Sequence, residues 1–205
     1  MRRSSFVATT GSMAGETIIL ASASPRRSEL LRGMGISFEV VTADVNEFDA
    51  NSAPDLVAVD LARENAWHKA EMVAAMRPGH WVLGADTVVA LDERVFGKPA
   101  SMDQARYFLM ELSGQTHEVI TGCALIGPDG SEDLFHRISH VTFQVLDRET
   151  VDRYLVEVNV LDKAGAYALQ EHGEWIVENV EGSRNNVIGL PTESLAKLFK
   201  KHGLL

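Results

Sequence analysis

The sequence is short of the features that mark several classes of protein. Its 205 residues contain one cysteine, Cys123, which excludes an intramolecular disulfide framework and a Cys-x-x-Cys metal knuckle and fits a reducing cytosol. The formal net charge is −10 and the sequence has no stripe of basic residues, so a nucleic-acid polymer is not expected as a partner. An acidic protein can still bind a small polyphosphate if its few cations converge in a cleft or if a divalent metal bridges the two.

The N-terminal segment is rich in arginine and serine and carries no acid before Glu16. Its longest apolar run, Phe6–Ala8, is far too short for a secretory signal or a membrane span. We therefore expect residues 1–16 to be a disordered extension, with Met13 as an alternative start, followed by one domain over residues 17–205. A cytoplasmic location without a membrane partner is the matching expectation.

Common catalytic and nucleotide-binding signatures are missing as well. The chain has no GxxxxGK[ST] loop, no GxGxxG after a strand, no GxSxG nucleophile elbow and, among seven histidines, no HExxH. What remains informative is the order of helices and strands and the polar residues placed within them.

Helical and strand patterns alternate without a strict βαβ rhythm, which predicts an α/β domain with a mixed central sheet flanked by helices. Apolar residues at helical spacing predict a helix over residues 53–75, and an apolar strand is predicted over residues 81–91. A hairpin is expected near Asp92, and residues 163–170 are expected to be extended.

The segment ASASPRR, residues 21–27, follows a short apolar strand and opens a helix. Ser24 suits the N-cap, and Pro25 suits the first helical position. Arg26 and Arg27 then lie in the first turn, where the helix dipole disfavours cations. Either the two guanidinium groups and the helix N-terminus hold an anion together, or the arginines are a solvated pair after a turn.

Asp86 is a carboxylate inside a strand that is otherwise apolar on both faces. A buried carboxylate is costly without a partner, so we expect a metal, a cation or a hydrogen-bond cluster beside it. Lys98, set between Gly97 and Pro99 across the expected hairpin, is the candidate cation. A functional site and a structural ion pair both fit this arrangement. Lys69, by contrast, is most simply a solvated charge on a helix face.

Six short motifs then combine into one signal. They are ASASPRR (residues 21–27), GADT (84–87), GKP (97–99), LSGQTH (112–117), DKAGAY (162–167) and GLP (189–191). In this order they resemble the Maf family of nucleoside-triphosphate pyrophosphatases over nearly the whole chain from Ile18. The resemblance implies a two-lobed single domain with a cleft, of Maf/ITPase-like type. DKAGAY together with Gln170 is similar to the subgroup acting on dTTP and UTP, which implies hydrolysis of these nucleotides to a nucleoside monophosphate and diphosphate.

The resemblance also implies roles for individual residues. Asp86 corresponds to the catalytic proton acceptor, and Lys98 belongs to the same catalytic set. Glu47, which alone would be a solvated loop charge, is implied with Asp86 as a ligand of a divalent cation, expected to be Mg²⁺. The substrate-binding and specificity residues that the resemblance implies are Ser22, Arg26, Arg27, Thr87, Lys163 and Gln170.

The sequence departs from the family pattern at three places. Asn65 stands where the family often has lysine, and Lys69, one helical turn later, is a candidate substitute. Glu171 follows Gln170 where glycine is usual, and the segment around Arg184 lacks the common aromatic residue. These departures put rate and base preference in question more than the reaction.

Other functions stay open at this stage. A non-catalytic nucleotide-binding regulator of septum formation would bind dTTP without releasing pyrophosphate, whereas a nucleotidyl- or phosphotransferase would need an acceptor other than water. A pyrophosphatase with a different base preference is a further alternative. The sequence does not fix the oligomeric state, so a homodimer stays open too.

Overall fold

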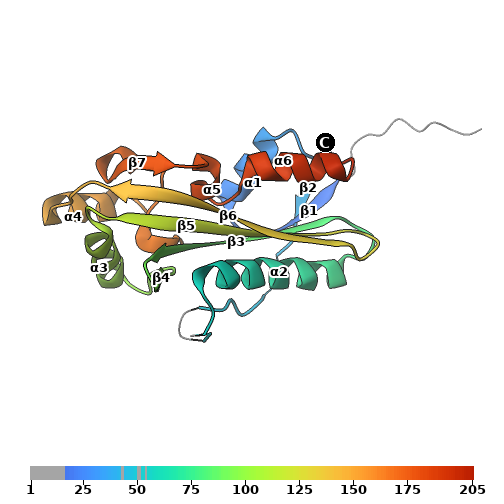
Figure 1. Cartoon of the computed structure of the whole chain (residues 1–205), viewed down its shortest axis with the longest axis horizontal. Coiled ribbons are helices and arrows are strands. Elements are labelled where there is room, and N and C mark those ends of the chain that lie inside the picture. The colour runs from blue at the N-terminus through green and yellow to red at the C-terminus, as the bar shows by residue number, and fades with distance from the viewer. Residues whose placement is uncertain (1–16, 43, 50–51, 54) are drawn as a thin grey trace, which may run out of the picture.

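The computed structural model describes residues 17–42, 44–49, 52–53 and 55–205, so the expectation for residues 1–16 lies outside the described residues. Its central sheet has seven strands in the order β2-β1-β3-β5-β6-β7, with β4 paired to β3 (Figure 1). The strand β1 runs parallel to β2 and β3, and the other pairs are antiparallel. The predicted mixed sheet is therefore confirmed.

The elements have the following bounds. The strands are β1 (Ile18–Ala21), β2 (Phe38–Val40), β3 (Val82–Leu91), β4 (Arg94–Phe96), β5 (Thr116–Ile126), β6 (Glu132–Phe143) and β7 (Val177–Glu181). The α-helices are α1 (Pro25–Gly33), α2 (Ala58–Met76), α3 (Met102–Leu112), α4 (Arg148–Glu157), α5 (Arg184–Ile188) and α6 (Thr192–Lys201), and two 3₁₀ turns are η1 (Ala164–Ala166) and η2 (Gly173–Trp175).

Helices cover both faces of the sheet. Helix α2 lies on one face, and α1, α5 and α6 lie over the other (Figure 1). The strand period of two explains this layering, because neighbouring residues of β3 point to opposite faces. Val82 packs in the same cluster as Ala66 of α2, whereas Leu83 packs in the same cluster as Phe199 of α6.

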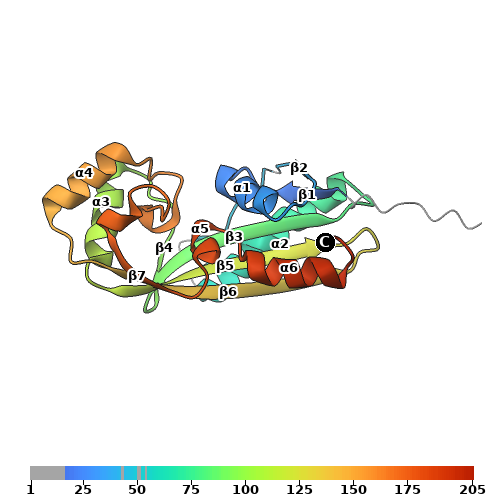
Figure 2. The ribbon, with the colours of Figure 1, turned by 90° about the horizontal axis from the view of Figure 1, so that it is seen from above.

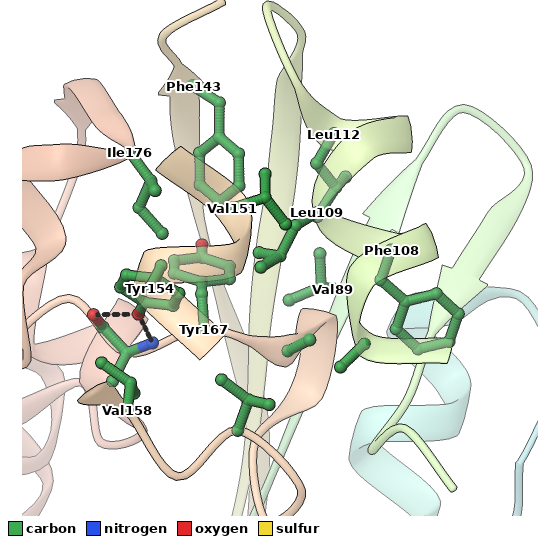
Figure 3. Close-up of a cluster of buried hydrophobic side chains, with 14 of the residues drawn as sticks. Val89, Phe108, Leu109, Leu112, Phe143, Val151, Tyr154, Val158, Tyr167 and Ile176 are labelled. Atoms are coloured by element: carbon green, nitrogen blue, oxygen red, sulfur yellow. Dashed lines mark hydrogen bonds between the residues drawn. The ribbon is translucent and has the colours of Figure 1, made fainter. Parts of the chain in front are cut away.

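The molecule has two lobes, as the family resemblance implies. The lobe with α3 and α4 lies at one end, and α1 with β1 and β2 lies towards the other (Figure 2). A separate apolar cluster fills the first lobe, and Figure 3 shows Phe143, Tyr154 and Tyr167 within it. The Tyr154 hydroxyl accepts a hydrogen bond from the Ala168 N–H at 3.0 Å and donates one to the Ala168 carbonyl at 3.2 Å. This pair of bonds fastens the segment after η1 to α4.

The sequence-based boundaries differ from the structure in two places. The helix predicted over residues 53–75 begins later, at Ala58, and ends at Met76. Residues 163–170 are not extended throughout, because Gly165 at φ +68° and Ala166 at φ +62° turn the chain through η1. The strand over 81–91 and the hairpin near Asp92 are confirmed as β3 and its turn into β4. Within the described part of the chain, no helix has both the length and the apolar character needed to cross a bilayer.

Candidate active site

A cleft of about 470 Å³ is lined by residues from the end of β1, the start of α1, the middle of β3 and the segment after α4. Every site residue expected from the sequence lines it, which is the first evidence that these distant motifs form one site. The expected residues among its lining are Ser22, Arg26, Arg27, Glu47, Asp86, Thr87, Lys98, Lys163 and Gln170. Further lining side chains that matter below are Lys69 and Asp162.

The cleft lies at a break in the sheet. On one side of β3, pairing with β1 ends at Ala21 opposite Gly84, and pairing with β4 begins at Phe96 opposite Val89. In the described structure neither strand pairs with residues 85–88 in between, although β5 pairs with β3 without interruption on the other side. The gap gives a ligand access to the middle of a strand that is otherwise buried.

Strand alternation sends the two polar residues of this gap to opposite faces. Asp86 points to the face covered by α2, where it meets Asn65 and Lys69. Thr87 points to the other face, where its hydroxyl accepts a hydrogen bond from Arg27 at 3.0 Å and lies 3.0 Å from the Thr121 hydroxyl. The GADT motif therefore presents a carboxylate and a hydroxyl from one strand to two walls of the cleft.

Two lysines and two carboxylates form an ion cluster on the α2 side. The Lys69 ammonium lies 2.6 Å from Asp86 Oδ1 and 2.8 Å from Glu47 Oε1, and Lys98 lies 2.9 Å from Glu47 Oε2. Two expectations are corrected here. Lys69 is not a solvated charge, because the chain carries it on the face of α2 that packs on β3 and leaves only 11% of its side chain exposed. Lys98 contacts Glu47 rather than Asp86, whose cation is Lys69.

The cluster sets the protonation of Glu47. Partial burial pushes the pKa of this carboxyl upward, but the charge of Lys69 and hydrogen bonds from Lys69 and Lys98 outweigh it and lower the pKa from 4.5 to about 2. Glu47 is therefore held as a carboxylate by two lysines. The sequence alone suggested a solvated loop charge without such partners.

Asn65 connects this cluster to the loop that carries Glu47. Its side-chain oxygen accepts a hydrogen bond from the Phe48 N–H at 2.8 Å, and its amide donates to the Phe48 carbonyl at 2.9 Å and to Asp86 Oδ2 at 3.3 Å. A lysine has no acceptor and cannot make the first of these bonds. Asp86 is thus held by two residues of α2: Asn65 donates a hydrogen bond from its amide, and Lys69 contributes a positive charge.

Arg27 lies at the junction of three segments and is buried. It donates to the Ser22 hydroxyl at 3.1 Å, to Thr87 at 3.0 Å and to the Gly189 carbonyl at 2.9 Å. Burial lowers the pKa of the guanidinium from its usual value, while the charges of Asp86 and Glu47 oppose that effect. Since three of its five N–H groups are engaged within the protein, Arg27 orders the cleft wall and retains donors for a ligand.

A chain of charges links the start of α1 to the segment that follows α4. Arg26 donates to Asp162 at 3.1 Å, and the ammonium of buried Lys163 lies 2.9 Å from Asp162 and 3.4 Å from Glu171. Glu171, one of the departures from the family pattern, therefore pairs with a lysine of the DKAGAY motif. Gln170 lies beside it and is exposed in the cleft. Asp162 was not among the predicted site residues, although its place directly before Lys163 in the motif was a usable signal.

The donor set suits a hard divalent cation that arrives with a ligand. Glu47 and Asp86 both lie within hydrogen-bond distance of one ammonium nitrogen, so their carboxylates face a common point. Mg²⁺ is commonly bound by one or two carboxylates together with substrate phosphates and water. Among the described residues, no group of three or more His, Cys, Asp or Glu side chains forms a metal site by itself.

Comparison with known proteins places the sequence. The family model described as "Maf-like protein" matches residues 17–202. The chain belongs to this family. The dTTP/UTP pyrophosphatase of Bacillus cereus (strain G9842) is 42% identical over 185 residues, which cover 90% of this chain and 94% of that protein. The dTTP/UTP pyrophosphatase of Akkermansia muciniphila is 43% identical over 186 residues, covering 91% and 96% of the two chains.

Solved structures give a weaker likeness. A nucleoside-triphosphatase / dITP/XTP pyrophosphatase from Mycobacterium abscessus aligns with a TM-score of 0.43 and 19% identity, covering 92% of this chain and 95% of that one. Membership of the Maf-like family rests on the family model and the sequence relatives.

Proposed function

We propose that this protein hydrolyses the α–β phosphoanhydride bond of nucleoside triphosphates, with dTTP and UTP as substrates. The products are the nucleoside monophosphate and inorganic diphosphate (pyrophosphate). The observation that carries the proposal is the break in the sheet, where Asp86 lies among the cations of a cleft. The names of the two relatives, dTTP/UTP pyrophosphatases at 42% and 43% identity over most of the chain, support it. Mg²⁺ as the cofactor and a cytoplasmic location belong to the same proposal.

The chemistry follows from the charges that converge in the cleft. A triphosphate brings several negative charges, and Arg26, Lys69 and Lys98 neutralise them. Glu47 and Asp86 would hold Mg²⁺, which neutralises phosphate charge and orients the attacking water when bound. Asp86 takes the proton from that water as it attacks phosphorus, because its carboxylate lines the cleft beside the break in the sheet.

Substitution of Asp86 tests its role. Asp86→Asn removes the charge at nearly constant shape, so we expect a folded protein whose rate of pyrophosphate release from dTTP falls at least about 10²-fold. Activity is measured by coupled pyrophosphate detection with Mg²⁺, and folding by circular dichroism. Asp44→Asn, which changes an exposed carboxylate of the same cleft, is the matched control and should stay within about threefold of wild type. Turnover by folded Asp86→Asn close to wild type would remove Asp86 from the mechanism.

Base preference is assigned to Gln170, since its amide offers both a donor and an acceptor to the imide edge of a pyrimidine. Thr87 is a weaker candidate, because its hydroxyl is engaged by Arg27 and Thr121. We expect kcat/KM for dTTP and UTP to exceed that for dATP and dGTP, and Gln170→Ala to narrow the difference at least about tenfold. Equal kcat/KM for purine and pyrimidine triphosphates in the wild type would contradict this assignment.

The same panel separates the enzyme from a non-catalytic regulator and from a transferase. A regulator releases no pyrophosphate from any nucleotide, and a transferase turns over only with an acceptor other than water. The position of Lys69 argues against a non-catalytic regulator. Although Asn65 stands where the family often has lysine, Lys69 still contacts Asp86 in this site.

A further inference from the structure

The ammonium of Lys69 occupies the point that the proposed function gives to a divalent cation. It lies 2.6 Å from Asp86 and 2.8 Å from Glu47, and these are the two carboxylates assigned to the metal. A divalent ion and an ammonium cannot both lie between the same two oxygens, because their charges repel over a few ångströms. Lys69 and the metal therefore compete for one carboxylate pair.

The surrounding structure holds Lys69 and the two carboxylates in place. Lys69 is held on a helix that lies unusually close to the sheet, since an added Cβ at Gly84 would lie 2.2 Å from the Ala66 carbonyl oxygen. Asn65 holds the other oxygen of Asp86 and the backbone beside Glu47. The carboxylate pair is thus kept together with an internal cation between its members.

A triphosphate offers Lys69 another partner. Its ammonium lines the same cleft as Arg26 and Lys98, and its four-carbon stem lets the charge move by several bond rotations without a shift of the helix. Once phosphate oxygens lie in the cleft, the ammonium can leave the carboxylates and contact the phosphates. The carboxylates are then free for a cation that the phosphates also bind.

We infer that Lys69 is a positioning residue that makes binding of the divalent cation depend on the nucleotide. Without nucleotide it neutralises Glu47 and Asp86 and keeps the metal weakly bound; with nucleotide it turns to the phosphates and the metal enters. This inference rests on the proposed function, because it assumes that the cleft takes a nucleotide and a metal.

The test measures Mn²⁺ binding to the protein without nucleotide, from the electron paramagnetic resonance signal of free Mn²⁺. Lys69→Met keeps the length and helix propensity of the side chain but removes the charge. We expect Lys69→Met to bind Mn²⁺ at least about tenfold more tightly than wild type, since two carboxylates then lack their internal cation. A purely structural role predicts the opposite, because a disturbed site binds metal more weakly.

Two controls make the result specific. Lys98→Met removes a charge from the same cleft, but among the described residues Lys98 pairs with Glu47 and not with Asp86, so its effect should be clearly smaller. Lys201→Met removes the same charge far from the cleft, beside Asp133, and should change Mn²⁺ affinity less than twofold. Unchanged or weaker Mn²⁺ binding by folded Lys69→Met, or equal tightening by Lys98→Met, overturns the inference. If Lys69→Met does not fold by circular dichroism, Lys69→Gln takes its place with the same expected direction.

A second measurement distinguishes failure of this inference from failure of the proposed function. Wild-type protein is titrated with Mn²⁺ in the presence of α,β-imido-dUTP, whose α–β link resists hydrolysis. Formation of the ternary complex together with unchanged affinity in Lys69→Met contradicts only the role of Lys69. Absence of any complex in the wild type contradicts the nucleotide and metal site itself, and with it the inference.

Discussion

His117 is a histidine of the LSGQTH motif that the structure places in the apolar cluster of the α3–α4 lobe. It is 1% exposed, its Nε2 lies 2.9 Å from the Tyr167 hydroxyl, and Phe143 packs edge-on against its ring. Burial lowers the pKa of His117 from 6.5 to about 4. Because the unfolded chain binds the proton more readily, His117 contributes stability that is full above about pH 6.5 and is lost as the pH falls towards 4.

We therefore predict a loss of about 2 kcal/mol in the free energy of unfolding from this residue between about pH 7.5 and about pH 5. His117→Gln keeps a partner for Tyr167 but does not titrate, so the difference in stability between wild type and variant should shrink by that amount at the lower pH. Urea unfolding at the two pH values measures it. His140→Gln, at an exposed position of β6, is the control, and a parallel pH dependence of wild type and His117→Gln would contradict the prediction.

The polar residues of the site were predictable from sequence to different degrees. Asp86 stood out because a carboxylate in an apolar strand needs a partner, and the structure gives it one. The partner was predicted wrongly, since the sequence showed Lys98 near Asp86 through a hairpin but did not show how α2 crosses β3. Lys69 became a cleft residue only because of that crossing, and helical period alone made it a surface charge.

At the scale of elements, the close packing of α2 on β3 and β5 is what positions Asn65 and Lys69. Two glycines allow it. An added Cβ at Gly84 would lie 2.2 Å from the Ala66 carbonyl oxygen, and one at Gly122 would lie 2.3 Å from the Ala62 carbonyl oxygen. Gly122 is the residue of β5 paired with Asp86, so this contact lies directly beside the candidate site.

Gly84→Ala should force α2 away from the sheet. The added methyl group meets helix backbone, which cannot move alone, so we expect a loss of about 1–3 kcal/mol or more in the free energy of unfolding. The shift also moves Lys69 from Asp86, so pyrophosphate release should fall by more than the loss of folded protein explains. Gly33→Ala in α1, where a Cβ meets nothing within 4 Å, is the matched control and should cost nothing. Wild-type stability of Gly84→Ala would show that the helix accommodates the methyl group.

Element types were more predictable than the site's shape. The apolar strand, the hairpin and the long helix followed from periodicity and turn residues, and all three are present. The break between β1 and β4 did not follow, because it depends on where two partner strands end rather than on any signal within β3. The 3₁₀ turn at Ala164–Ala166 was missed for a similar reason, since a left-handed Ala166 is set by packing and not by its own preference.

At the scale of the whole molecule, the lobe of α3 and α4 and the region of α1 lie apart along the sheet (Figure 2). Residues at the start of α1 and in the segment after α4 both line the cleft. An ion pair in the cleft joins these two parts, between Arg26 at the start of α1 and Asp162 in the loop after α4, at 3.1 Å. Asp162 therefore holds an arginine that the proposed function assigns to the triphosphate. A substrate phosphate that binds Arg26 therefore competes with this carboxylate for the guanidinium charge.

Asp162→Asn removes that competition, so we predict a KM for dTTP roughly three- to tenfold lower, with kcat changed less than about twofold. KM should fall for two reasons. Substrate binding no longer has to break the ion pair of Arg26, and the cleft loses a negative charge near the phosphates. Stability should hardly change, because exposed ion pairs contribute about 0–1 kcal/mol and Lys163 keeps its contacts with Glu171 and the Asn159 carbonyl. Steady-state kinetics at low and high salt measure the effect, which should shrink with salt as charges are screened.

The control variant Arg26→Ala should raise the KM for dTTP instead. A raised KM in Asp162→Asn would mean that the carboxylate orients Arg26 for the substrate, and the ion pair would then be part of the binding site rather than its competitor.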